Sequence, residues 1–167
     1  MGQSLIGFAR SVKGETMSLE NIYSVEVPDA WTDHYGHMNE GYYVVAASDA
    51  SWALQAKLGI GTDYYDATGF ALVTVEAHVR YLDEVNRGET LSFNSLILGY
   101  DSKRLHTAHV FKVGERECGT IEFMWLHLDH KAGRTAPFPE EIEARLAQHL
   151  VTELPDWASR QIGLKKK

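Results

Sequence analysis

Four segments between residues 70 and 129 alternate apolar and polar residues and follow one another with only short connections. They cover residues 70–82, 90–100, 104–113 and 119–129. An alternation with a period of two residues is typical of strands that bury one face. Parallel neighbours need long crossovers, so these short connections predict antiparallel pairing. Residues 23–27 alternate in the same way up to Pro28 and predict one more strand.

One long helix is predicted before the four strands. The apolar residues that recur there at helical spacing are rich in alanine: Tyr43, Ala46, Ala47, Ala50, Ala53, Leu54 and Leu58. Asn39 can cap the start of this helix and Gly59 its end. Small side chains let a helix lie close to a sheet. We therefore predict an α+β fold in which one long central helix is wrapped by a curved antiparallel sheet. A turn-rich stretch covers residues 59–69, and a last helix covers residues 140–150.

Length and composition limit the class of protein. The chain has 167 residues, which favours a single domain. We predict a weakly ordered arm over residues 1–20, the domain over residues 21–150 and a tail over residues 151–167. Lysine plus arginine minus the acidic residues is 16 − 23 = −7. This balance disfavours nucleic acid as a partner, because such binding depends on cations that neutralise phosphates.

Membrane, secretory and metal-binding classes receive no support from the sequence. No apolar run approaches the roughly 20 residues of a membrane span. Residues 1–8 are too short and too poor in positive charge for a secretory signal, so we expect a cytoplasmic protein. The single cysteine, Cys118, excludes an internal disulfide and a four-cysteine zinc site. Two histidine pairs are spaced three residues apart, which places their members on opposite faces of a strand: His106 with His109, and His127 with His130. We therefore predict no metal site.

Residues 31–43 form the densest group of chemically useful side chains. Asp33, His34, Gly36 and His37 lie in a loop that runs directly into the predicted helix. A helix N-terminus offers unpaired backbone N–H groups and the positive end of a dipole, which suit a polarised carbonyl or an oxyanion. A carboxylate beside it can attack directly or activate a water molecule. The alternative is that Asp33 only caps a turn.

The loop carries a family resemblance. The stretch Asp33-His34-Tyr35-Gly36-His37-Met38-Asn39, followed by Tyr42 or Tyr43, resembles the Asp-x-x-Gly-His-Val-Asn motif of 4-hydroxybenzoyl-CoA-type hotdog thioesterases. Residues 74–85 and 98–106 resemble more closely the thioesterase module fused to some L-carnitine dehydrogenases, whose stand-alone relatives are betainyl-CoA thioesterases. The resemblance covers about residues 22–147. One departure is Glu40, where many relatives of the broader family carry a second asparagine.

The resemblance implies a hotdog fold and the hydrolysis of betainyl-CoA to glycine betaine and CoA in carnitine breakdown, with no cofactor. It implies that Asp33 is the catalytic carboxylate and that the Glu40 and Gly41 amides bind the oxyanion. Asp49, inside the helix, is a second candidate for the carboxylate. Two alternatives stay open: another short or aromatic acyl-CoA as substrate, or a noncatalytic binder of acyl-CoA or a quaternary amine.

Substrate-binding residues are expected around the same loop. A trimethylammonium group donates no hydrogen bond of the usual kind, so proteins commonly hold it between aromatic rings. The candidates for the acyl group are Trp31, Tyr35, His37, Asn39, Tyr42 and Tyr43. Glu76 and His78 lie on the polar face of the strand over residues 70–82, which in the family follows the dimer seam near the active site. A plain cross-strand or cross-interface pair is the alternative for these two.

Cations are needed for the phosphates of CoA. The candidates are Arg80, Lys103, Arg104 and Arg134, since arginine makes bidentate phosphate contacts. An ordinary solvated turn also explains Lys103 and Arg104. The predicted sheet has an exposed edge that invites pairing with a second copy. We therefore expect a homodimer, which can assemble further into a dimer of dimers.

Overall fold

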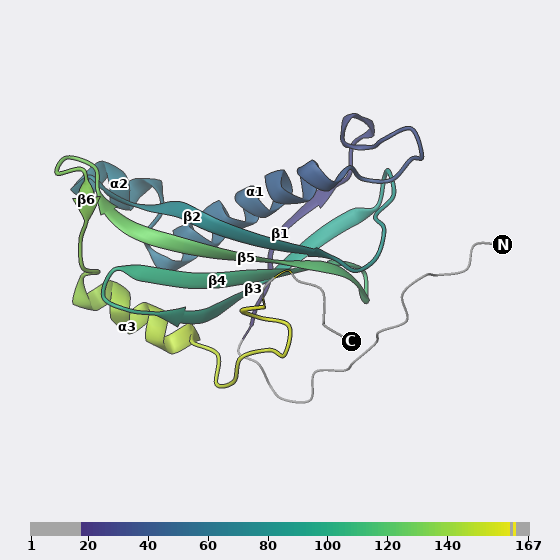
Figure 1. Ribbon diagram of the computed structural model, residues 1–167. Coiled ribbons are helices and arrows are strands. Elements are labelled where there is room, and N and C mark those ends of the chain that lie inside the picture. The colour runs from purple at the N-terminus through teal and green to yellow at the C-terminus, as the bar shows by residue number, and fades with distance from the viewer. Residues whose placement is uncertain (1–17, 161, 163–167) are drawn as a thin grey trace.

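A computed structural model describes residues 18–160 and 162 and shows one curled sheet around one long helix (Figure 1). The strands are β1 (Leu19–Glu26), β2 (Phe70–Tyr81), β3 (Thr90–Tyr100), β4 (Arg104–Val113), β5 (Arg116–Asp129) and β6 (Arg134–Thr135). The helices are α1 (Glu40–Leu58), α2 (Thr62–Thr68), α3 (Glu140–His149) and the 3-10 turn η1 (Asp29–Trp31). All the strand pairs are antiparallel, in the order β1-β3-β4-β5-β2, with β6 beside β5. The predicted α+β hotdog architecture is confirmed.

The position of α1 follows from its caps and its alanines. The Asn39 side chain accepts a hydrogen bond from the Gly41 N–H at 3.1 Å, and Gly59 ends the helix with a φ of 74°, a left-handed conformation that glycine adopts without strain. Ala46, Ala47 and Ala50 are fully buried. With only a methyl group at each of these positions, α1 can lie close against the concave face of the sheet.

A neutral histidine is sealed in the core between α1 and the sheet. His109 lies between Ser51 of α1 and Ser95 of β3, at 2.8 Å from each hydroxyl. Ser51 donates its own proton to the Ala47 carbonyl, so it accepts from His109 Nε2–H and Ser95 donates to Nδ1. Burial lowers the pKa of His109 to about 3. This histidine is therefore a structural link rather than a metal ligand or a base.

The structure differs from the sequence prediction at several places: β5 begins at Arg116 rather than at residue 119, β6 was not predicted, and three further differences concern α2, β1 and β2. Residues 62–68 form α2, where turns were expected. The Tyr64 hydroxyl of α2 donates to His127 Nε2 of β5 at 2.9 Å and so ties this helix to the sheet. His127 Nδ1 in turn donates to the Ala136 carbonyl. β1 begins at Leu19, inside the predicted arm, whose residues 1–17 lie outside the described residues. β2 has a bulge between Thr74 and Glu76. The bulge puts Val73 and Val79 on opposite faces, although strict alternation predicts one face for both.

β2 is an edge strand with an apolar surface. Within the described residues it pairs only with β5. Its Val73, Val75 and Tyr81 side chains are exposed, Val75 by 53%. Three large apolar residues of α1 are exposed as well: Val44, Val45 and Trp52. An unpaired edge bordered by apolar side chains is the kind of surface that a second chain covers.

The convex face of the sheet is covered by the segment that follows α3, drawn in yellow in Figure 1. Leu96, Leu98 and Ala108 of β3 and β4 form a second apolar cluster with Val151, and Trp157 packs against it. The Val151 N–H also donates to the Ile97 carbonyl at 3.0 Å. None of the helices in the described part of the chain is long and apolar enough to cross a membrane.

Candidate active site

Asp33 holds a tight loop at the entrance to α1. Its Oδ1 accepts the N–H groups of Tyr35 at 2.8 Å and His37 at 3.3 Å. Its backbone N–H donates to the His37 carbonyl, and the Gly36 N–H donates to the Asp33 carbonyl. Asp33 therefore does cap a turn, as its simpler interpretation predicts. Because both contacts use Oδ1, Oδ2 has no hydrogen-bond partner among the described residues.

The loop is tied to the start of α1 through backbone contacts. The Asn39 N–H donates to the Trp31 carbonyl at 2.9 Å, and the Met38 N–H donates to the Val85 carbonyl at 2.7 Å. At the first turn of α1, the Gly41 N–H is engaged by the Asn39 side chain, whereas the Glu40 N–H has no acceptor among the described residues. Of the two amides predicted to bind the oxyanion, the Glu40 N–H is thus free. The Gly41 N–H is hydrogen-bonded to the Asn39 side chain and can bind an oxyanion only when this hydrogen bond breaks.

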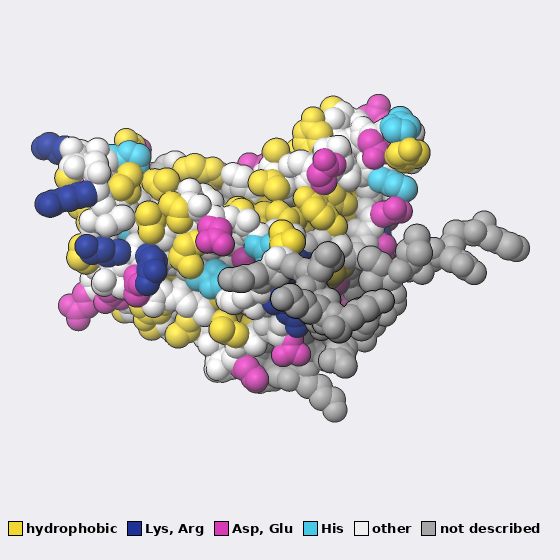
Figure 2. Space-filling view, viewed as in Figure 1, with side chains coloured by type: hydrophobic (Ala, Val, Ile, Leu, Met, Phe, Trp, Pro, Cys, Tyr) yellow, Lys and Arg dark blue, Asp and Glu magenta, His cyan; other side chains and the backbone are white. Residues whose placement is uncertain are grey.

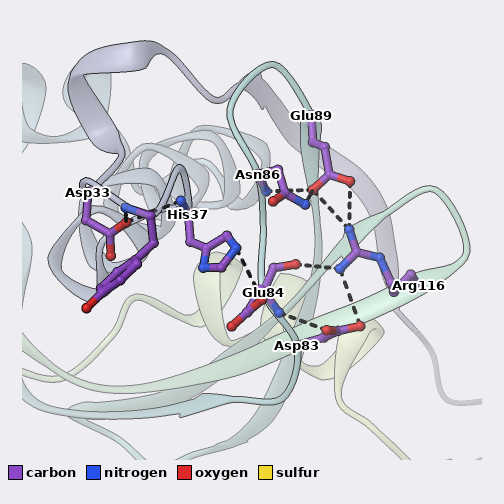
Figure 3. A network of polar contacts seen from close by, with 8 residues as sticks. Asp33, His37, Asp83, Glu84, Asn86, Glu89 and Arg116 are labelled. Carbon is purple, nitrogen blue, oxygen red and sulfur yellow. Dashed lines mark hydrogen bonds and ion pairs between the residues drawn. The ribbon is translucent and has the colours of Figure 1, made fainter. Parts of the chain in front are cut away.

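His37 belongs to a polar network between the loop and the β2–β3 connection (Figure 3). His37 Nε2 lies 3.4 Å from Glu84 Oε2. Arg116 of β5 donates to both oxygens of Glu89, at 2.8 and 3.0 Å, and lies 3.3 Å from Asp83 Oδ2. Burial alone would raise the pKa of Glu89, but hydrogen bonds from the Asn86 N–H and from Arg116 lower it below its ordinary value. The network fixes the Asp33 loop against the sheet.

The aromatic residues near Asp33 fall into two groups. Trp31 and Tyr42 stack on each other with ring centres 5.5 Å apart, and both pack against the core. Tyr43 is 4% exposed, touches Tyr81 and Phe111, and has a pKa that burial raises to about 12. Tyr35, by contrast, is 73% exposed. Tyr43 is thus a core residue within this chain, and Tyr35 is the ring most open to a ligand.

Asp49, the second candidate carboxylate, lies away from the Asp33 loop. It is exposed and accepts a hydrogen bond from the Tyr23 hydroxyl at 3.2 Å. Nine residues of helix separate it from Glu40, about 13 Å along the axis. Its alanine neighbours in the sequence suggest a buried carboxylate without a partner, but the Asp49 carboxylate is exposed and hydrogen-bonded. Within one chain, a carbonyl held at the start of α1 would be out of its reach.

Glu76 and His78 lie on the convex face of the sheet, opposite α1. His78 faces Glu122 across the β2–β5 pair, and Nδ1 of His78 is 3.6 Å from Glu122 Oε1. The Glu122 side chain is only 7% exposed and accepts from His106 Nε2 at 2.9 Å and from the Ser159 N–H at 2.8 Å. These residues line a cavity of about 260 Å³ that Glu76 borders. His78 thus takes part in a cross-strand contact with Glu122, as the alternative predicts, whereas Glu76 has no such partner among the described residues.

Replacing Glu122 with alanine should loosen the segment that covers the convex face. The Ser159 N–H would lose its acceptor, and we expect a loss of about 1–3 kcal/mol in the free energy of unfolding. Amide hydrogen exchange at Ser159 should become faster. Glu76→Ala is the matched control, because Glu76 borders the same cavity but makes no side-chain hydrogen bond in the described structure. Unchanged exchange at Ser159 in Glu122→Ala would show that this contact does not hold the segment.

Three of the four predicted CoA-binding cations, Lys103, Arg104 and Arg134, lie at the other end of the molecule, whereas Arg80 lies next to Tyr81 at the Asp33 end of β2. Arg134 faces Asp129 in the β5–β6 pair, and the Lys103 carbonyl accepts the His127 N–H. Figure 2 shows basic side chains gathered at this end, on the left, while at the other end Arg87 and Arg116 are each paired with acidic side chains. Arg80 lies on the convex face, two residues after His78. The structure thus brings Lys103 and Arg134 together, but not to Asp33.

Arg104 has a structural partner. Its guanidinium contacts Asp101 Oδ2, with Nε at 2.7 Å, in the β3–β4 turn. Hydrogen bonds from the Lys103 N–H and from Arg104 lower the pKa of Asp101 to about 2. The interpretation of residues 103–104 as an ordinary turn therefore holds for Arg104. In the described residues, no group of three histidine, cysteine or acidic side chains could hold a metal ion.

A loop that carries a carboxylate and leads into the central helix of a curled sheet is typical of one class of protein, the hotdog-fold thioesterases. Residues 27–146 match the model of the thioesterase-like superfamily, and the chain belongs to this superfamily. A betainyl-CoA thioesterase of Pseudomonas aeruginosa is 35% identical over 148 residues, which cover 85% of this chain and 93% of that protein. The chain is an acyl-CoA thioesterase.

Two further likenesses extend the comparison. An L-carnitine dehydrogenase/betainyl-CoA thioesterase of Agrobacterium fabrum is 36% identical over 167 residues, which cover 95% of this chain and 34% of that protein. The chain thus spans about a third of this fused relative. A Staphylococcus aureus protein solved in complex with CoA superposes with a TM-score of 0.79 at 22% identity, covering 94% of this chain and 100% of that one. This structure supports the fold.

Proposed function

We propose that this thioesterase hydrolyses betainyl-CoA, giving glycine betaine and free CoA. The observation that carries the proposal is the likeness to the Pseudomonas aeruginosa betainyl-CoA thioesterase, which extends over nearly the full length of that protein. The Asp33 loop at the start of α1 supplies the chemistry. Hydrolysis of a thioester needs only water as co-reactant, so no cofactor is proposed. We place the reaction in the cytoplasm, with neither nucleic acid nor a membrane as partner.

The proposed reaction uses the contacts around Asp33. The thioester carbonyl binds at the first turn of α1, where the free Glu40 N–H donates to its oxygen. The Gly41 N–H joins when it exchanges the Asn39 side chain for the developing oxyanion. Asp33 Oδ2 then attacks the carbonyl carbon or takes a proton from an attacking water. If water attacks, its oxygen bonds to the carbonyl carbon, the C–S bond breaks, and the proton taken by Asp33 passes to the CoA thiolate. If Asp33 attacks, the C–S bond breaks to leave an anhydride between the acyl group and Asp33, and water then hydrolyses this anhydride, which releases glycine betaine, restores the Asp33 carboxylate and supplies the proton for the CoA thiolate.

The active site is proposed to form between two copies of the chain. Within one copy, β2 runs from Phe70, opposite Asp129 and hence beside Arg134, to Tyr81, whose hydroxyl donates to the Glu40 carbonyl. These ends are about 35 Å apart. The pantetheine arm of CoA is as long as about five extended residues, about 17 Å, so it does not span them.

A homodimer removes this mismatch. If β2 pairs with β2 of a second copy in antiparallel orientation, the start of one strand lies beside the end of the other. The basic end of the partner, with Lys103 and Arg134, then lies next to the Asp33 loop. The exposed apolar residues Val75 of β2 and Trp52 of α1 are available for this contact. The dimer can associate further into a dimer of dimers.

Release of free thiol from a small set of thioesters tests the proposed substrate. We expect the wild type to prefer betainyl-CoA over 3,3-dimethylbutanoyl-CoA, which has the same shape but a carbon in place of the charged nitrogen. A preference for the neutral thioester would contradict the betainyl assignment and leave the thioesterase class intact. No thiol release from any thioester would favour a noncatalytic binder.

The Tyr35 ring should contribute to this preference. Tyr35→Leu removes the ring but keeps apolar bulk, so the betainyl-to-neutral ratio of kcat/KM should fall about three- to thirtyfold. Trp31→Leu is the contrasting variant, because Trp31 stacks on Tyr42 and packs against the core. We expect it to lower both activities and the melting temperature together. An equal loss on both substrates in Tyr35→Leu would exclude the ring from the cation site.

A further inference from the structure

Glu40 is the one carboxylate around the start of α1 that has no partner in the described residues. It is exposed and makes no ion pair or side-chain hydrogen bond there. Four neighbouring acids are each paired: Asp29 with Arg87, Asp83 and Glu89 with Arg116, and Glu84 with His37. Glu40 is also the first residue of α1, and helical side chains lean toward the N-terminus. Its side chain therefore leaves α1 at the end that carries the amides proposed to bind the thioester carbonyl.

A cationic acyl group creates an electrostatic problem at this position. In betainyl-CoA one methylene separates the quaternary nitrogen from the carbonyl carbon. A carbonyl oxygen held by the amides of α1 therefore brings the positive charge next to the positive end of the helix dipole, which is unfavourable. A carboxylate in the first turn offsets this repulsion. Among the first three residues of α1, only Glu40 carries a charge.

Tyr81 completes the surroundings of this carboxylate. Its hydroxyl donates to the Glu40 carbonyl at 3.0 Å, and its ring packs edge-on against Tyr43 while 46% of the residue stays exposed. Burial and then the negative charge of Glu40 raise the pKa of Tyr81. An exposed aromatic ring and an unpaired carboxylate thus lie together at the start of α1. Aromatic faces and carboxylates are the two groups that attract a quaternary ammonium ion.

We propose that the Glu40 carboxylate and the Tyr81 ring form the subsite for the quaternary ammonium of the substrate and set the preference for a cationic acyl group. This inference rests on the proposed function, because it takes betainyl-CoA as the substrate. It assigns to the Glu40 side chain a role separate from that of its backbone amide. It also adds Tyr81, which the sequence analysis did not single out.

The test compares betainyl-CoA with 3,3-dimethylbutanoyl-CoA on the intact protein and its variants. Glu40→Gln keeps the shape and the amide but removes the charge, so the betainyl-to-neutral ratio of kcat/KM should fall about five- to thirtyfold. The loss should be larger on betainyl-CoA than on the neutral thioester. Tyr81→Leu should lower the same ratio about three- to thirtyfold. Tyr81→Phe keeps the ring and should keep the ratio, even if loss of the hydroxyl contact slows both reactions.

Glu140→Gln is the matched control, because Glu140 is the exposed first residue of α3 and lies in no proposed site. Its ratio should equal that of the wild type. If Glu40→Gln keeps the wild-type ratio, or loses both activities equally, the subsite is wrong while the proposed function stands. If the wild type itself shows no preference for betainyl-CoA, the proposed substrate fails first. High salt should lower the wild-type ratio and leave that of Glu40→Gln unchanged, because screening acts only on the charge.

Discussion

Asp33→Asn should lower the rate of thioester hydrolysis by at least about a hundredfold while leaving the fold intact. The amide keeps an oxygen that can accept from the Tyr35 and His37 N–H groups, so the turn that Asp33 caps is preserved. What it loses is the negative oxygen that would attack the carbonyl or take a proton from water. The measurement is thiol release under saturating substrate, together with the melting temperature of the variant.

The comparison with Asp49→Asn makes this prediction decisive. Asp49 is exposed, is bonded to Tyr23 and lies about 13 Å along α1 from Glu40. If Asp33→Asn kept near-normal turnover and Asp49→Asn abolished it, the helix carboxylate would be the catalytic group. A large drop in the melting temperature of Asp33→Asn would instead assign Asp33 to the turn alone.

The elements that the sequence predicted well are those with a strong local signal. The alanine stripe lies within α1, Asn39 and Gly59 cap its two ends, and each long strand carries its own alternation. α2 was missed because its stability depends on a distant contact, the hydrogen bond between Tyr64 and His127. The bulge at Val75 was missed because alternation alone does not show where a strand gains a residue.

The same distinction applies to the candidate site. The Asp33 loop and the start of α1 are adjacent in sequence, so their proximity could be predicted. Which face of β2 carries His78, and whether Tyr43 is buried, depends on how distant strands pack. Tyr81 was missed for this reason, because nothing in its own segment shows that it reaches the Glu40 carbonyl. The only feature of the sequence that could have indicated Tyr81 is its position: it is an aromatic residue at the end of a predicted strand, directly before the acidic turn that contains Asp83 and Glu84.

The separation of charge between the two ends of the molecule links the site to assembly. One end carries Asp33 and Glu40, with Arg87 and Arg116 there already paired with acidic residues, and the opposite end carries Lys103 and Arg134. The proposed substrate has the complementary distribution, with a cationic acyl group and anionic phosphates at the two ends of the pantetheine arm. Antiparallel pairing of two β2 strands places one acidic end beside one basic end, twice per dimer. In the proposed dimer, each chain would therefore contribute halves of two different sites.

A mixture of two damaged variants should regain activity if the sites form in this way. The first variant is Asp33→Asn. The second is the double variant Lys103→Ala/Arg134→Ala, which should lose about ten- to a hundredfold in kcat/KM because two phosphate contacts are removed. Arg104 is left unchanged, since its contact with Asp101 holds the β3–β4 turn. Sedimentation should show that both variants remain dimers.

After the two variants are unfolded together and refolded at equal amounts, half of the dimers should contain one copy of each. In such a dimer, one site combines Asp33 of the double variant with the intact basic end of its partner, while the other site carries both defects. The mixture should therefore show about a quarter of the wild-type activity at low substrate concentration, well above the mean of the two parents. If each site lay within one chain, every site would keep one defect and the mixture would show only that mean. A fully active monomer in sedimentation would equally overturn the shared site, because CoA alone would then have to span the length of β2, about 35 Å, which separates the start of α1 from the basic end.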